Sequence, residues 1–225
     1  MMFFYDYYWL ILIPVVVAMI ASANVNSTYR KYQQVANSRG LTGEMAARKI
    51  LDANGLFNVR IEHIAGKLSD HFDPRDNVVR LSDSTFASSS VAAVGVAAHE
   101  VGHAIQYAEN YTPIRIRMAI LPVAQFGSSA WILFFILGIV FNMPILRGIG
   151  IGLFAAIVLF QLITLPVEFN ASHRALATIK NQGILFGAEY TGAKKTLTAA
   201  AMTYVASLAV ALLQLLRLIA SSRRD

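Results

Sequence analysis

The chain has 225 residues, of which 56% are hydrophobic and only 14% charged, and its formal net charge is +6. Ordinary soluble domains carry roughly 25% charged residues, so this composition argues against a soluble protein. The chain has no cysteine, which excludes disulfide bonds and thiolate metal ligands. Its basic residues form no run interleaved with aromatic residues, so we expect no nucleic-acid partner.

Four long segments contain no Asp, Glu, Lys or Arg. Each has at least the ~20 residues that a helix needs to cross the hydrocarbon core of a bilayer. We therefore predict a mainly α-helical, multi-pass membrane protein with about four transmembrane helices, in contact with a lipid bilayer. Buried helices of a soluble protein are disfavoured, because uncharged apolar runs of ~18 residues are rare in soluble folds. The predicted spans are residues 7–29, 118–141, 148–167 and 196–216.

The polar region after the first span predicts a small mixed segment. Thr42 suits the N-cap of a short helix that Asn54-Gly55 would end. Alternation of apolar and polar residues predicts one strand within 58–64, and a second is predicted at Val78–Leu81, giving a small β-hairpin. The second strand is either a free edge that pairs with an extended peptide or a strand packed on the helix that follows. That helix is predicted over residues 92–108, capped by one of the serines at 88–90.

The helix over residues 92–108 contains an HExxH motif, His99-Glu100-Val101-Gly102-His103. Residues four apart lie on one face of a helix, so both imidazoles can reach one zinc ion. Glu100 lies about 100° around the helix from His99, close enough to hold and deprotonate a water molecule on the metal. The alternative is a packed histidine pair beside a surface glutamate. It is disfavoured because buried His and Glu side chains without a metal are costly.

Two histidines leave a catalytic zinc site incomplete, because such a site has three protein ligands and an open position. A third histidine six residues after the motif is excluded, since Glu109 stands there. We predict Glu168 as the third ligand, because it directly follows the third predicted span and an anionic oxygen offsets the metal charge. His173 is the competing ligand. Glu109 faces away from the metal on the helix of the motif, Glu189 lies in a later polar segment, and both are expected to be solvated.

Four segments together resemble the YugP-like family of small bacterial membrane zinc peptidases. They are Ser69–Arg75 (SDHFDPR), Val79–Ser82 (VRLS), Ala98–Gln106 (AHEVGHAIQ) and Leu165–Ser172 (LPVEFNAS). The resemblance covers nearly the whole chain, and it implies a neutral zinc metallopeptidase with the gluzincin ligand set. One departure is Asn170, where the family segment is expected to carry Asp. This departure concerns one hydrogen bond beside the ligands and not the ligand Glu168.

The sequence therefore predicts a zinc metallopeptidase that hydrolyses peptide or membrane-protein substrates, with Zn²⁺ as cofactor and Glu100 as general base. We treat residues 1–225 as one membrane-embedded domain with catalytic segments at 58–111 and 168–195. The alternative is a non-enzymatic membrane scaffold or adaptor that retains a structural zinc. A transporter is disfavoured because no predicted span carries an ionisable residue near its middle. Arg174 either stabilises negative charge on the substrate, as His173 could, or pairs with a carboxylate.

The basic residues also predict an orientation in the cell membrane. Fifteen of the 19 lie in residues 30–117 and 168–195, on one side of the predicted spans. By the positive-inside rule this side, with the active site, faces the cytoplasm. The first span has no positive charge before it, so we interpret it as a retained helix with its N-terminus outside. Arg217, Arg223 and Arg224 after the last span argue mildly against this orientation.

Overall fold

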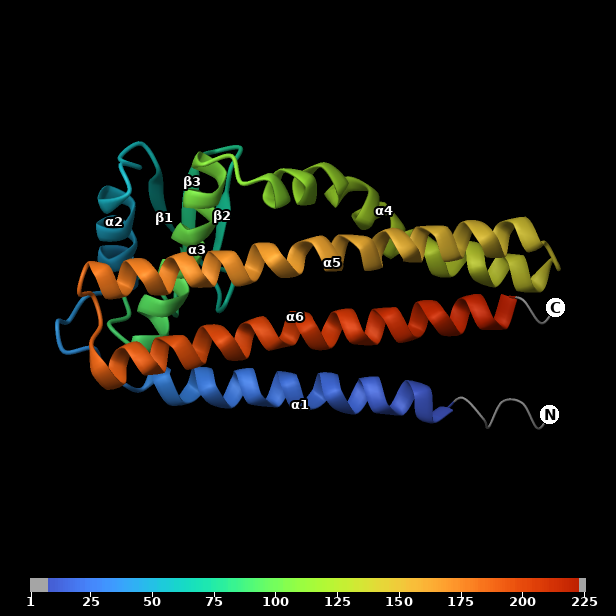
Figure 1. The fold of residues 1–225 in the computed structure, drawn as a ribbon, viewed down its shortest axis with the longest axis horizontal. Coiled ribbons are helices and arrows are strands. Elements are labelled where there is room, and N and C mark those ends of the chain that lie inside the picture. The colour runs from blue at the N-terminus through green and yellow to red at the C-terminus, as the bar shows by residue number, and fades with distance from the viewer. Residues whose placement is uncertain (1–7, 223–225) are drawn as a thin grey trace. The chain divides into compact units, whose positions relative to one another are not determined.

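The computed structural model describes residues 8–222, in which six helices and three strands form (Figure 1). Tyr7, where the first predicted span begins, lies outside these residues. In chain order the elements are α1 (Tyr8–Gln33), α2 (Gly43–Ala53), β1 (Arg60–Ile64), β2 (His71–Asp73), β3 (Val78–Ser82), α3 (Val91–Ala108), α4 (Thr112–Val140), α5 (Pro144–Asn181) and α6 (Gly187–Ser222).

Four of the helices, α1, α4, α5 and α6, are long and apolar enough to cross a membrane. Only 6–28% of the residues in their most apolar stretches are buried inside the protein. Apolar surface on this scale is unfavourable in water but suits the interior of a bilayer. The prediction of a mainly α-helical chain with about four transmembrane helices is therefore confirmed. The segment 168–195 is almost entirely helical, since α5 continues to Asn181 and α6 begins at Gly187.

The described residues form two compact units. The first, called here the sheet unit, consists of Ala23–Ile114 and Val167–Ala201 and contains the three strands, α2 and α3. The second, called the helical unit, consists of residues 8–22, 115–166 and 202–222. All the candidate residues of the HExxH motif, together with Glu168, belong to the sheet unit.

Within the helical unit, α4 and α5 approach closely at glycines. A Cβ atom at Gly127 would lie 2.9 Å from the carbonyl oxygen of Leu153, and one at Gly150 would lie 2.8 Å from that of Trp131. Small residues at such positions let membrane helices pack backbone against backbone. The connection between these helices is short, with Asn142 at a positive φ of 49° between the end of α4 and the start of α5.

The sheet has the strand order β1-β3-β2. β3 pairs in parallel with β1, where Arg60 lies opposite Val78, and antiparallel with β2, where Phe72 lies opposite Val79. Both edges of β3 are thus occupied, so the hypothesis that Val78–Leu81 is a free edge strand is wrong. The predicted hairpin between the strand within 58–64 and Val78–Leu81 is wrong, because these strands, β1 and β3, run parallel. The antiparallel neighbour of β3 is β2, which sequence missed because it is only three residues long and shows no periodicity.

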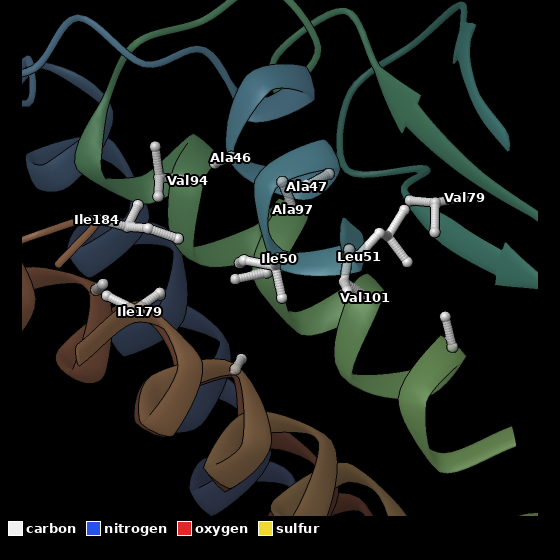
Figure 2. Close-up of a cluster of buried hydrophobic side chains, with 14 of the residues drawn as sticks. Ala46, Ala47, Ile50, Leu51, Val79, Val94, Ala97, Val101, Ile179 and Ile184 are labelled. Atoms are coloured by element: carbon white, nitrogen blue, oxygen red, sulfur yellow. The ribbon is translucent and has the colours of Figure 1, made fainter. Parts of the chain in front are cut away.

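The core of the sheet unit lies where α2 and α3 meet the sheet and α5 (Figure 2). Both short helices begin at the predicted caps: the Thr42 side chain accepts from the Met45 N–H, and the Ser90 side chain accepts from the Ala93 N–H. The fully buried Ile50 and Leu51 of α2 face Val101 of α3 in this core. Burial of these apolar side chains stabilises the packing of α2 against α3.

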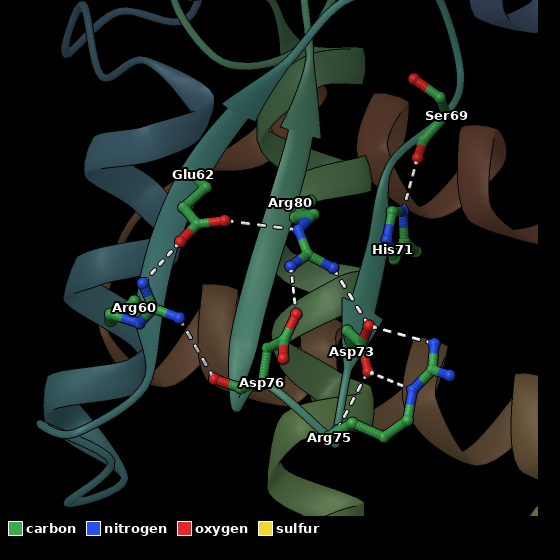
Figure 3. Close-up of polar contacts among 8 residues, drawn as sticks. All are labelled: Arg60, Glu62, Ser69, His71, Asp73, Arg75, Asp76 and Arg80. Atoms are coloured by element: carbon green, nitrogen blue, oxygen red, sulfur yellow. Dashed lines mark hydrogen bonds and ion pairs between the residues drawn. The ribbon is translucent and has the colours of Figure 1, made fainter.

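Ion pairs across one face of the sheet hold β2 against β3 (Figure 3). The Arg80 guanidinium of β3 donates to Glu62 on β1, to Asp73 on β2 and to Asp76 in the turn between β2 and β3. Hydrogen bonds from Arg75, assisted by Arg80, lower the pKa of Asp73 to about 2. The three-residue strand is therefore anchored by charge as well as by its backbone pairing.

Candidate metal centre

Helix α3 presents His99, Glu100 and His103 toward one region of the sheet unit. The rings of the two histidines are 4.8 Å apart between centroids and nearly perpendicular. Glu100 and His103 are buried, and His99 is half-buried. The spacing of the motif thus places two imidazoles side by side in a place with little access to water.

Glycine at position 102 allows α5 to approach this face of α3. A Cβ atom at Gly102 would lie 2.5 Å from the carbonyl oxygen of Ala171 and 3.2 Å from its Cα atom. Real Cβ atoms do not make the first of these contacts, so any side chain here would push α5 away. The close contact brings the polar side chains of α5 within reach of the two histidines.

Glu168 is the residue of α5 that meets both histidines. Its Oε2 atom lies 3.2 Å from Nε2 of His99 and 3.7 Å from Nε2 of His103. The side chain is almost completely buried. One ligand atom from each of the three residues lies within 4.8 Å of the others, and this is the metal-ligand cluster found among residues 8–222.

The donor set and its spacing fit zinc. Zinc–nitrogen and zinc–oxygen bonds of about 2.1 Å in a tetrahedron place neighbouring donor atoms about 3.4 Å apart. The separations of 3.2 and 3.7 Å from the Glu168 oxygen bracket that value. Two imidazole nitrogens and one carboxylate oxygen also match the three-ligand sets of catalytic zinc, which leave one position open.

Glu100 lies beside this cluster without belonging to it. Burial raises the pKa of its carboxyl to about 7, against the opposing effect of His99 and with help from the negative charges of Glu168 and Asp70. The backbone of Phe72, in β2, has a small opposing effect that lowers the pKa of the Glu100 carboxyl. A carboxyl with a pKa near neutrality can both take up and release a proton at physiological pH.

The other residues considered from sequence lie outside the donor cluster. His173, the competing ligand, is exposed on α5. Glu109 is mostly exposed, as expected, and pairs with Arg174 at 2.7 Å. Glu189 is half-buried and accepts from the Ser38 N–H at 2.7 Å, so the expectation that it is solvated is wrong.

Arg174 is engaged with neighbouring side chains. Its NH1 atom pairs with Glu109, its Nε atom donates to Asn170 Oδ1 at 2.7 Å, and its guanidinium lies 5.9 Å from the centre of the Tyr111 ring. Of the two roles considered for Arg174, these contacts favour pairing with a carboxylate over contact with substrate.

Two neighbours of the histidines were missed by sequence reasoning. Ser172 Oγ lies 3.0 Å from Nδ1 of His99, and Gln106 Oε1 lies 3.0 Å from Nδ1 of His103. The signal available for both was helical spacing: Ser172 lies four residues after Glu168, and Gln106 three residues after His103. Each histidine therefore has one ring nitrogen near Glu168 and the other held by a neutral side chain.

Comparisons with known proteins agree with this geometry. Residues 7–223 match the model of a family described as "Putative neutral zinc metallopeptidase". The chain is 47% identical over 199 residues to "Putative membrane protease YugP" of Bacillus subtilis (strain 168), an alignment that covers 88% of each chain. No solved structure matches the chain.

Proposed function

The chain belongs to the family of neutral zinc metallopeptidases, and on that premise we propose that it hydrolyses peptide bonds with His99, His103 and Glu168 as zinc ligands and Glu100 as general base. Zinc as the cofactor follows from the family and from the grouped donors. The observation that carries the proposed mechanism is the placement of Glu100. It is a buried carboxyl beside three clustered metal donors, and it is not one of them.

Each residue has a distinct role in the proposed reaction. A zinc ion held by the three donors would supply Lewis acidity for the substrate carbonyl and for the attacking water. Glu100 accepts a proton from that water as the water oxygen adds to the peptide carbonyl carbon. It then gives the proton to the leaving amine as the carbon–nitrogen bond breaks.

The competing function is a membrane scaffold or adaptor with a structural zinc. Structural zinc sites are closed, normally with four protein ligands. The cluster found among the described residues supplies three donors, which favours an open, catalytic site. Glu100, a buried carboxyl beside the donors that is not one of them, is suited to act as the base in hydrolysis.

We propose further that this is a protein of the cell membrane whose sheet unit faces the cytoplasm. The support is the distribution of basic residues, 15 of 19 of which lie in residues 30–117 and 168–195. The substrates in this proposal are peptides or membrane proteins accessible from that side.

The test of the enzymatic function uses the purified full-length chain in detergent. A peptide library made by digesting a whole proteome is the probe, and new N-termini are counted by mass spectrometry. We expect cleavage by the zinc-loaded protein, loss of cleavage after chelation and recovery on adding zinc back. A zinc-loaded, folded protein that generates no new N-termini would favour the scaffold.

A further inference from the structure

Gln106 is a completely buried side chain that contacts a proposed zinc ligand without being one. Its Oε1 atom lies 3.0 Å from Nδ1 of His103. An amide oxygen can only accept a hydrogen bond, so this contact requires a hydrogen on Nδ1. A neutral imidazole with its hydrogen on Nδ1 has a free lone pair on Nε2, the nitrogen that faces Glu168.

The orientation of the Gln106 amide determines which tautomer of His103 it favours. If the amide nitrogen faced Nδ1 of His103, it would donate a hydrogen bond and require a lone pair on Nδ1. The Nε2 atom of Gln106 donates to the Val167 carbonyl oxygen and to Asn170 Oδ1, both at 2.9 Å. The Val167 carbonyl can only accept. Turning the amide over would place its oxygen against the acceptor oxygens of Val167 and Asn170 in a buried site, which is repulsive and leaves the Gln106 oxygen without a donor.

The Asn170 amide is held in turn by an arginine. Arg174 Nε donates to Asn170 Oδ1 at 2.7 Å, and an arginine has no acceptor atom. Asn170 must therefore turn its oxygen toward Arg174 and Gln106. Arg174 is itself held by the Glu109 carboxylate and packed near the Tyr111 ring. The direction of every hydrogen bond from Arg174 to His103 is thus determined.

We propose that Gln106 is a positioning residue that fixes His103 in the tautomer with its hydrogen on Nδ1, so that Nε2 is ready to bind the metal. The Val167 carbonyl and the Asn170 side chain, oriented by Arg174, keep the Gln106 amide in the required direction. This inference rests on the proposed metal site. It also explains how Asn170 serves where Asp was expected, since its oxygen accepts both hydrogen bonds that a carboxylate oxygen would accept.

The other histidine offers an internal contrast. Ser172 Oγ lies 3.0 Å from Nδ1 of His99, but a hydroxyl can rotate to donate or to accept. Ser172 can therefore hold the ring of His99 in place without deciding its tautomer. Loss of the Gln106 amide should therefore change which tautomer His103 adopts. Loss of the Ser172 hydroxyl should have no such effect on His99, because Ser172 does not select the tautomer of that ring.

The test measures two properties of the full-length protein in detergent micelles. The first is the zinc dissociation constant, from competition with a chelator. The second is the tautomer of His103 in the metal-free protein at alkaline pH, from NMR of ¹⁵N-labelled histidine. In wild type we expect a single tautomer with its hydrogen on Nδ1. In Gln106→Met, which keeps the side-chain length but removes the amide, we expect zinc binding about 10–100-fold weaker and loss of the single tautomer.

Three further variants separate positioning from general loss of structure. Asn170→Asp keeps both accepted hydrogen bonds and should bind zinc within about threefold of wild type, whereas Asn170→Leu should weaken it by up to about 10-fold. Thr196→Val removes a buried hydrogen bond to the Gly192 carbonyl, within α6, and should leave both readouts unchanged. Should Gln106→Met fail to fold, the pair of Asn170 variants carries the test.

Wild-type zinc affinity together with an unchanged His103 tautomer in folded Gln106→Met would overturn the proposal. Equal zinc affinity in Asn170→Leu and Asn170→Asp would overturn the role proposed for Asn170 and Arg174. A wild-type chain that binds no zinc would instead overturn the proposed function. The NMR measurement on the metal-free protein would still decide the role of Gln106 in that case.

Discussion

Replacing Gly102 by alanine should damage the metal site more than it damages the fold. The added Cβ atom would meet the Ala171 carbonyl oxygen at 2.5 Å, whereas ordinary contact begins at 3.4 Å. The backbone of α5 would therefore have to move by about 0.9 Å relative to α3, a distance set by that difference. Glu168 lies less than one helical turn from Ala171 and would move with it.

Two opposing terms make the change in stability small. Overpacking a tight contact costs about 1–3 kcal/mol, and alanine is favoured over glycine inside a helix by about 1 kcal/mol. We expect a net loss of about 0–2 kcal/mol in the free energy of unfolding. Zinc sites tolerate ligand displacements of only about 0.2 Å, so zinc affinity should fall by about 10-fold or more.

The control is Gly95→Ala on the same helix. A Cβ atom there would lie 3.5 Å from the Ala193 Cβ atom, which is ordinary contact, so stability should stay equal or rise by up to about 1 kcal/mol. Chelator competition and thermal unfolding of both variants measure the two quantities. If Gly102→Ala binds zinc as tightly as Gly95→Ala and wild type, the close approach of α5 does not set the position of Glu168 and the reasoning fails.

Three other predictions concern the ligand set, the orientation and the sheet. Glu168→Ala should lose tight zinc binding while His173→Ala keeps it, and the reverse result would assign the third ligand to His173. Single cysteines that replace Ser84 and Asn142 in this cysteine-free chain should react from opposite sides of the membrane of intact cells. Labelling at position 84 by an impermeant reagent from outside would contradict the cytoplasmic assignment. The Asp73 pKa of about 2 lies below its usual 3.8. The stabilisation of the folded state by the ionised Asp73 is therefore present above about pH 4 and is lost as the pH falls toward 2. Asp73→Asn should therefore lower the free energy of unfolding by about 1–2 kcal/mol at neutral pH. This is less than the full effect of the pKa shift, because Arg75 is exposed and its charge is screened. An equal loss at pH 2 would argue against this assignment.

The features that sequence predicted well are those set by local rules. The membrane helices follow from uncharged apolar runs, because a bilayer tolerates few charges along ~20 residues. The caps at Thr42 and Ser90 follow from the hydrogen-bond needs of a helix N-terminus. The pairing of His99 with His103 follows from helical spacing alone.

The features that sequence missed depend on contacts between distant segments. Gln106 and Asn170 are 64 residues apart, and they meet only because Gly102 lets α5 approach α3. Likewise, the central place of β3 depends on pairing with the short β2, whose sequence carries no strand pattern. Glu189 was expected in solvent because its neighbours are polar, but the Ser38 N–H, 151 residues away, binds it.

The central claim is that Glu100 acts on the substrate water and does not bind the metal. Zinc content and peptide turnover, measured on the same preparation of Glu100→Gln, test it most directly. Glu44→Gln, which removes an exposed carboxylate from the first turn of α2, is the matched control. We predict that Glu100→Gln retains one zinc per chain and loses turnover by about 10²–10⁴-fold, while Glu44→Gln behaves as wild type. Near wild-type cleavage by Glu100→Gln, or loss of its zinc, would contradict the account.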